Sequence, residues 1–178
     1  MLFVFLVPTE PPADFQAQTI SSTEVRCTWD PPPTQSWNGD LLGYKIYYWA
    51  LDGSHGNQVK TVAATENEAI LTDLKMYTEY GLVMLAFNAA GDGPNTTVPI
   101  ATTTNQGVPD QPGVLDFTMI SLTELNVTWT PPSLPNGIIT SYEVSYYQDM
   151  LVDGKDYGLS RHCISTGYSH MNFIPSYQ

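Results

Sequence analysis

The stretch SSTEVRCTWDPPP at residues 21–33 decides the fold, because it returns as SLTELNVTWTPPS at residues 121–133. A second block, WNGDLLGYKIYY at residues 37–48, returns as PNGIITSYEVSYY at residues 135–147. Two blocks repeated in the same order and at nearly the same offset indicate a duplicated module.

Apolar and polar residues alternate within these blocks, as they do in a β-strand that buries one face. In the first block Val25, Cys27 and Trp29 share one side, and Trp129 takes the place of Trp29 in the repeat. Proline cannot donate to a β-ladder, so the Pro-Pro pair that follows each tryptophan ends the strand. The Asn-Gly pair at the start of each second block predicts a tight turn before the next strand.

Further alternating segments extend this pattern through the first hundred residues. Tyr44, Ile46 and Tyr48 share one face of a strand, residues 80–86 form another, and a last strand runs through residues 97–103. No stretch sustains the apolar period of an amphipathic helix. Short strands separated by turns predict an all-β fold of antiparallel sandwiches, one for each copy of the repeat.

The charge balance bears on the class of partner. The chain of 178 residues has 18 acidic and six basic residues, a formal net charge of −12. No basic stripe exists, which argues against nucleic acid and anionic lipid as partners. The excess acidic residues either form a solvated surface or attract a basic partner or cations.

The N-terminal run MLFVFLV, residues 1–7, has seven apolar residues. A membrane-spanning helix needs about 20. The run also lacks the basic segment and the cleavage site of a signal peptide. We interpret it as a first strand, or as sequence left from an upstream segment or an artificial start, with a signal-peptide remnant as the alternative.

Four motifs of the first copy resemble the fibronectin type III family. They are the strand that ends in Trp29 and Pro-Pro, the pattern N-G-x-x-x-x-Y-x-I-x-Y at residues 38–48, LKMYTEY at 74–80, and AFNAAGDGP at 86–94. Together they span nearly all of a first domain placed at residues 8–104. The last two motifs are most similar to tandem modules of Dscam-like and sidekick-like adhesion receptors and of receptor tyrosine phosphatases.

The resemblance implies an immunoglobulin-like sandwich with a tyrosine corner at Tyr80. Its hydroxyl would bond back to the preceding loop and hold the start of the strand. The residues expected to form the structural core are Trp29, Tyr44, Leu74, Tyr80, Trp129 and Tyr142.

The second domain, residues 109–178, departs from the family pattern. Aligning Leu74 with Tyr177 leaves nothing to match residues 78–103, so we expect this module to lack its last two strands. A sandwich without them would expose a sheet edge and half of its core. We therefore interpret the chain as a fragment of a longer array, with a marginally stable second module.

Two N-glycosylation sequons occur, at Asn95 and at Asn126. Each predicts a glycan only if the chain is secreted, and chance is the alternative explanation. Cys27 is predicted to be a small buried hydrophobic residue. It falls in a different domain from Cys163, so we expect no disulfide between the two. No catalytic, metal-binding or cofactor-binding motif is present, and we expect no enzymatic activity, metal or cofactor.

Aromatic residues on the outer side of the sheet form the candidate interaction face. Tyr47 and Trp49 alternate with the inward residues of their strand, and Trp37 lies in the loop before it. Aromatic side chains are enriched at protein interfaces. The alternative is cross-strand packing that stabilises the sheet, with Lys60 stacked over the rings.

The sequence thus favours a non-catalytic adhesion, recognition and spacer module of a larger cell-surface or matrix protein, located outside the cell. Its partners would be other proteins, in homophilic or heterophilic contacts, and any membrane attachment would come from other parts of the parent chain. An intracellular scaffold module of the muscle-filament kind is one alternative. An accessory module of a receptor phosphatase is the other.

Overall fold

The computed structural model describes residues 6–113, 115–121, 124–148, 151–152, 155–156, 159–165 and 170–173. It divides into two compact units, Met1–Gly107 and Val108–Gln178. The described residues form strands, turns and one short 3-10 turn, η1 (Thr34–Ser36), without an α-helix. None of them forms a helix that is long and apolar enough to cross a membrane. The all-β prediction is confirmed.

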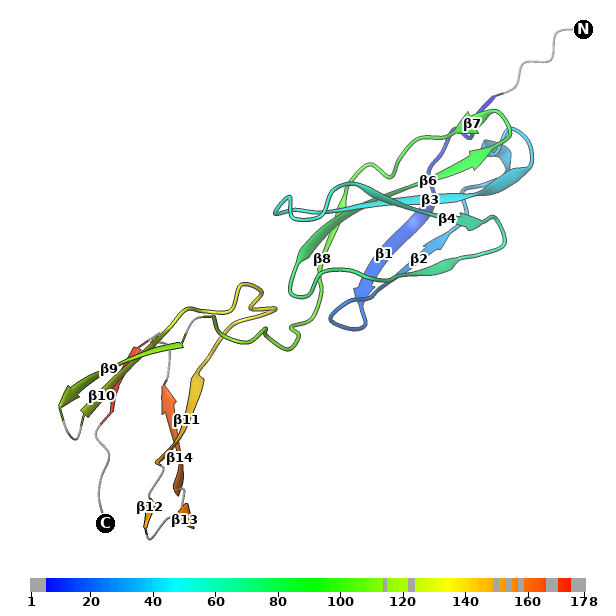
Figure 1. Cartoon of the computed structure of the whole chain (residues 1–178). Coiled ribbons are helices and arrows are strands. Elements are labelled where there is room, and N and C mark those ends of the chain that lie inside the picture. The colour runs from blue at the N-terminus through cyan, green and yellow to red at the C-terminus, as the bar shows by residue number, and fades with distance from the viewer. Residues whose placement is uncertain are drawn as a thin grey trace, which may run out of the picture. The chain divides into compact units, whose positions relative to one another are not determined.

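The first unit is a sandwich of two antiparallel sheets (Figure 1). One sheet has the order β1-β2-β5 and the other the order β4-β3-β6-β7, with β8 paired to the same edge of β6. The strands are β1 (Ala13–Thr19), β2 (Val25–Asp30), β3 (Leu41–Ala50), β4 (Gln58–Ala63), β5 (Glu68–Leu71), β6 (Glu79–Asn88), β7 (Gly91–Asp92) and β8 (Ile100–Thr103).

The core of the first unit lies between the two sheets and comes from the alternation within each strand. Trp29 of β2 meets Tyr44 of β3 edge to face, with the ring centroids 5.3 Å apart. This pair therefore joins one sheet to the other. The remaining core residues with less than a tenth of their surface exposed are Phe15, Val25, Cys27, Leu41, Ile46, Ala50, Ala69, Leu71, Leu74, Tyr80, Leu82, Met84 and Ala86.

The ends of the expected strands differ from the observed ones. The last strand begins at Ile100 rather than near residue 97. Residues 1–5 lie outside the described part of the chain, and Leu6 and Val7 belong to no strand, so the expected first strand is absent at these two residues. The first strand of the described chain is β1.

The Asn-Gly turn has the same geometry in both units. Asn38 and Asn136 both adopt positive φ, at 53° and 50°, which asparagine tolerates better than most residues. The side-chain amide of Asn38 donates to the carbonyl of Val7, and that of Asn136 donates to the carbonyl of Val108, each at 2.8 Å. Each asparagine thus ties its turn to the segment that enters its own unit.

The second unit repeats the Trp-Tyr pair. Trp129 and Tyr142 have their ring centroids 5.3 Å apart, the same separation as Trp29 and Tyr44. Its described strands form a sheet in the order β15-β10-β9 and two two-stranded pairs, β11-β14 and β12-β13. They are β9 (Leu115–Ser121), β10 (Glu124–Trp129), β11 (Tyr142–Gln148), β12 (Leu151–Val152), β13 (Lys155–Asp156), β14 (Leu159–Ser165) and β15 (His170–Phe173).

The first strand of the second unit leaves its apolar side chains open to solvent. Phe117 stands opposite the buried Val127 in the β9–β10 ladder, yet 69% of its surface is exposed. Leu115, opposite the buried Trp129, is exposed to a similar extent. In the first unit Phe15 of β1 is buried. Among the described residues, β9 therefore leaves more apolar surface exposed at these positions than β1 does at Phe15.

Candidate interaction surface

The outer face of the β4-β3-β6 sheet is built by strand register. In β3 the residues Lys45, Tyr47 and Trp49 alternate with the core residues Tyr44 and Ile46. Directly opposite residues in an antiparallel ladder lie on the same face of the sheet. The residues that share this outer face are therefore Lys45, Tyr47 and Trp49 of β3, Val59 and Thr61 of β4, and Gly81, Val83, Leu85 and Phe87 of β6.

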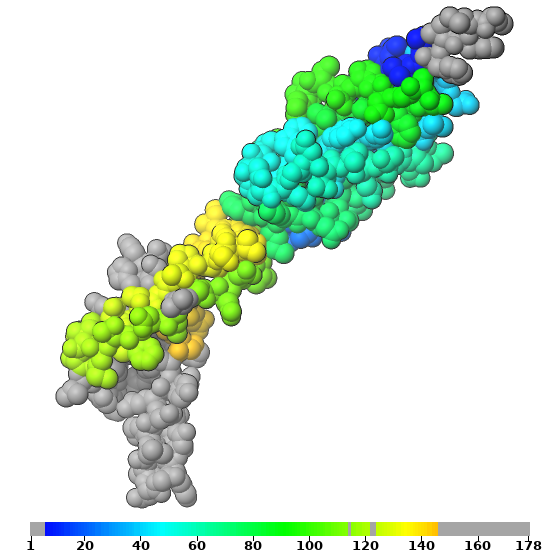
Figure 2. Space-filling model, turned by 45° about the horizontal axis from the view of Figure 1, so that its top comes forward, coloured from blue at the N-terminus to red at the C-terminus, as the bar shows by residue number. Residues whose placement is uncertain are grey.

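This outer face is largely apolar and partly accessible. Tyr47 and Trp49 are half-buried, and Leu85 between the neighbouring side chains is buried. Val59 on β4 is 53% exposed, and Leu51, just after β3, is 50% exposed. Figure 2 shows the β3–β4 region, in cyan tones, at the surface of the first unit. Solvent therefore reaches an aromatic and aliphatic surface on this side of the sheet.

The Trp49 ring approaches the neighbouring strand closely because the residue opposite it is a glycine. Gly81 stands opposite Trp49 in the ladder, and a Cβ on Gly81 would come within 2.9 Å of the indole ring atoms. A glycine inside a strand often marks such a close approach. Part of the Trp49 side chain thus packs across the strands, which agrees with the alternative that these aromatic residues stabilise the sheet. The rest of the side chain is exposed.

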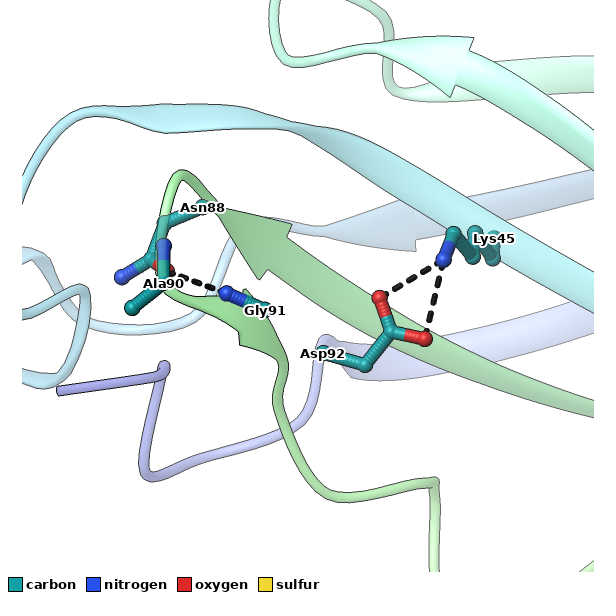
Figure 3. Close-up of polar contacts among 5 residues, drawn as sticks. All are labelled: Lys45, Asn88, Ala90, Gly91 and Asp92. Atoms are coloured by element: carbon teal, nitrogen blue, oxygen red, sulfur yellow. Dashed lines mark hydrogen bonds and ion pairs between the residues drawn. The ribbon is translucent and has the colours of Figure 1, made fainter.

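Lys45 closes one end of the outer face (Figure 3). Its Nζ lies 2.7 and 2.9 Å from the two carboxylate oxygens of Asp92 and 5.2 Å from the centre of the Phe87 ring. The hydrogen bond to Asp92 raises the pKa of Lys45. The expectation that Lys60 stacks over the rings is wrong, because Lys60 stands opposite the inward-facing Ile46. The cation that lies over a ring on this face is Lys45.

Trp37 does not belong to the outer face. Its indole N–H donates to the carbonyl of Pro32 at 2.8 Å, and its ring packs against the core. The structure therefore brings Tyr47 and Trp49 together on one surface and leaves Trp37 apart from them.

Asn88, at the end of β6, holds three segments together, and Figure 3 shows the one at Ala90 and Gly91. Its side-chain nitrogen donates to the carbonyls of Leu6 and Trp37, at 2.8 and 2.9 Å. Its side-chain oxygen accepts from the backbone N–H groups of Ala90 and Gly91, at 2.8 and 3.2 Å. Sequence reasoning missed this residue, although it lies within the AFNAAGDGP motif.

Tyr80 is buried in the first unit and its hydroxyl has two neighbours. It accepts a hydrogen bond from the backbone N–H of Lys75 at 2.9 Å, and Nδ1 of His55 lies 3.0 Å away. Burial raises the pKa of Tyr80, so the hydroxyl stays protonated at neutral pH. Leu74, just before Lys75, is also buried. This arrangement fixes the loop before β6 against the strand.

Cys27 is a buried free thiol in β2. Burial raises its pKa to about 12, so it stays neutral and unreactive at neutral pH. The side chain of Cys163 lies outside the described residues. Within the described part of the chain, no group of histidine, cysteine and acidic residues could hold a metal ion.

The two sequons occupy different environments. Asn95 is exposed, in the segment between β7 and β8. Asn126 is half-buried in β10, where it stands opposite Thr118 of β9 on one side and Asn172 of β15 on the other.

Comparison with known proteins decides the family. The profile described as Fibronectin type III domain matches residues 10–103 and 110–175. The chain belongs to the fibronectin type III family. The second match is partial. The solution structure of the third fibronectin III domain of human KIAA0343 protein agrees with this fold, with a TM-score of 0.54 and 26% identity over 58% of this chain and 89% of that one.

The relatives of this fibronectin type III chain include adhesion proteins. It is 42% identical to Protein sidekick-2 of Gallus gallus over 149 residues and 45% identical to Protein sidekick of Drosophila melanogaster over 148 residues. These matches cover 83% and 79% of this chain. It is also 33% identical to the cell adhesion molecule DSCAML1 of Mus musculus, over 78% of this chain. The resemblance to sidekick-like and Dscam-like proteins is confirmed, and the chain spans 7% of the length of each of these relatives.

Proposed function

We propose that this chain is a non-catalytic spacer and recognition segment of a larger extracellular adhesion protein, and that it acts through protein contacts at the outer face. Its kinship with sidekick proteins and with a named cell adhesion molecule supports an adhesive role. The observation that carries the proposal is the partly exposed apolar surface around Tyr47 and Trp49. We further propose domain limits at residues 8–104 and 109–178 and a location at the cell surface or in the matrix.

The chemistry of the outer face suits a protein contact. Tyrosine and tryptophan bury a large area and carry much of the binding energy at interfaces. Here Tyr47 and Trp49 are flanked by the exposed Val59 and Leu51. The charged pair Lys45–Asp92 stands at one end, so a polar group borders the apolar surface on that side.

The partner we propose is a second copy of the chain. A two-fold contact uses the same patch on both copies, so a single apolar surface is enough to form it. The first unit has eleven acidic and four basic residues, and two copies therefore repel each other. Apolar burial must overcome this repulsion, and salt screens it. Self-association should consequently strengthen as the salt concentration rises, whereas binding to a basic partner would weaken.

Replacing Tyr47 and Trp49 together by serine is expected to weaken self-association by about tenfold or more, because each substitution removes an aromatic side chain from the contact. Sedimentation velocity over a range of protein concentrations, at low and at moderate salt, measures this. Ile70→Ser is the matched control, since Ile70 is 39% exposed on the other sheet. Unchanged self-association in a double variant that melts like the wild type would refute the role of the outer face.

A further inference from the structure

The segment between β7 and β8 presents Asn95 at the edge of the larger sheet. The backbone N–H of Thr96 donates to the carbonyl of Met84 at 2.8 Å, and the N–H of Met84 donates to the Thr96 hydroxyl at 3.2 Å. These two bonds hold the segment along β6. Asn95 and Thr97, on either side of Thr96, are both exposed.

This arrangement gives Asn95 what an N-glycosylation acceptor needs. The sequon requires an asparagine amide and, two residues later, a hydroxyl, both within reach of an enzyme, and no proline between them. In Asn95-Thr96-Thr97 the two reacting side chains are exposed and the middle residue is the one bound to the sheet. In Asn126-Val127-Thr128 the asparagine is half-buried in the central strand of its sheet and Val127 is buried. Both sequons match the N-x-T pattern, but the asparagine is exposed in the first and half-buried in the second.

The surroundings of Asn95 leave apolar surface for a glycan to cover. A groove of about 350 Å³ runs beside it between the two sheets, lined by Pro11, Pro12, Asp14, Phe15 and residues 96–98 and 100. Val98 on its border is 72% exposed. β8, which forms this edge of the sheet, has only four residues, and proteins commonly block such edges to prevent pairing with another chain. A bulky, soluble group on Asn95 would block this edge.

We propose that Asn95 carries an N-linked glycan and is preferred over Asn126 as the acceptor. The inference rests on the proposed extracellular function, because the reaction takes place in the secretory pathway. The side-chain nitrogen of Asn95 forms a bond to C1 of an oligosaccharide supplied by a lipid-linked pyrophosphate donor. The bond between C1 and the pyrophosphate oxygen breaks, the lipid pyrophosphate leaves with the electron pair, and the amide nitrogen gives up one proton.

The test uses the whole chain, secreted from animal cells behind an added leader peptide and recovered from the medium. Glycans are removed by peptide N-glycosidase in ¹⁸O-water, which marks every formerly glycosylated asparagine, and the peptides are measured by mass spectrometry. The expected result is a label on Asn95 in most molecules and on Asn126 in a smaller fraction. Thr97→Ala should abolish the label on Asn95, and Thr97→Ser, which keeps a hydroxyl, should retain it.

Secreted protein with an unlabelled Asn95, or with Asn126 labelled more fully than Asn95, overturns the inference. This outcome is independent of the proposed contact at the outer face, because the added leader sends the chain through the secretory pathway whatever its parent does. If Asn95 is glycosylated but substitution of Tyr47 and Trp49 does not change self-association, the glycan inference is supported and the proposed contact at the outer face is refuted.

Discussion

Trp29→Ala is expected to destabilise the first unit by about 3–5 kcal/mol, the range for removing a large aromatic side chain from a core. Trp29 joins the two sheets through its edge-to-face contact with Tyr44, so its loss opens a cavity between them. A small domain is stable by only about 5–15 kcal/mol in total. The variant should therefore unfold at a much lower urea concentration than the wild type, or fail to fold.

Cys27 offers a specific probe for this prediction. Its thiol is buried and neutral in the folded first unit, so a thiol reagent reaches it only when that unit opens. Pulsed labelling over a urea series, read out by the mass of the Cys27 peptide, follows the first unit alone. Trp129→Ala is the matched control, because it removes the equivalent tryptophan from the second unit and should leave Cys27 labelling unchanged. A Trp29→Ala midpoint equal to that of the wild type would show that the pair with Tyr44 does not hold the sheets together.

Asn88→Ala is expected to destabilise the same unit by about 2–6 kcal/mol, the range for the loss of four hydrogen bonds. The substitution removes four hydrogen bonds, each with a net contribution of about 0.5–1.5 kcal/mol, and leaves carbonyl and N–H groups without their partner. Asn88→Asp separates the two halves of this network. It retains an acceptor for Ala90 and Gly91 but loses both donor bonds and introduces a charge at a buried position, so it should also destabilise the unit.

The same Cys27 labelling measures the Asn88 variants. Asn67→Ala is the control, since Asn67 is exposed and surface substitutions usually change stability by less than about 0.5 kcal/mol. If Asn88→Ala labelled like the control, the links from Asn88 to Leu6 and Trp37 would contribute nothing to stability.

The strands with one buried face could be predicted from sequence, because the alternation of apolar and polar residues that marks them is local. Burial on one face imposes an alternation that is visible within a few residues, as at Val25, Cys27 and Trp29. The edge strand β4 gives no such signal. Five of its six residues are exposed, and the sixth is half-buried, so its two faces do not differ enough to leave a pattern.

The polar links of the first unit could not be predicted because they join residues far apart in sequence. Asn88 donates to Leu6 across 82 positions, and Lys45 meets Asp92 only because β3 pairs with β6 and β6 with β7. The face of Lys60 cannot be predicted from the residues of β4, because they do not reveal the register of β4 against β3. Its aromatic ring and its position before β3 group Trp37 with Tyr47 and Trp49, whereas the loop conformation directs its N–H to Pro32.

Hydroxyl-radical footprinting shows whether the outer face is where this module meets its partner. The measurement compares oxidation of Tyr47 and Trp49 in the dilute protein and at concentrations where it self-associates. Tyr77, which is 45% exposed and lies outside β3, β4 and β6, serves as the internal reference. The proposed contact predicts that Tyr47 and Trp49 lose reactivity on association while Tyr77 keeps its own. Association that leaves Tyr47 and Trp49 as reactive as in the dilute protein would contradict it.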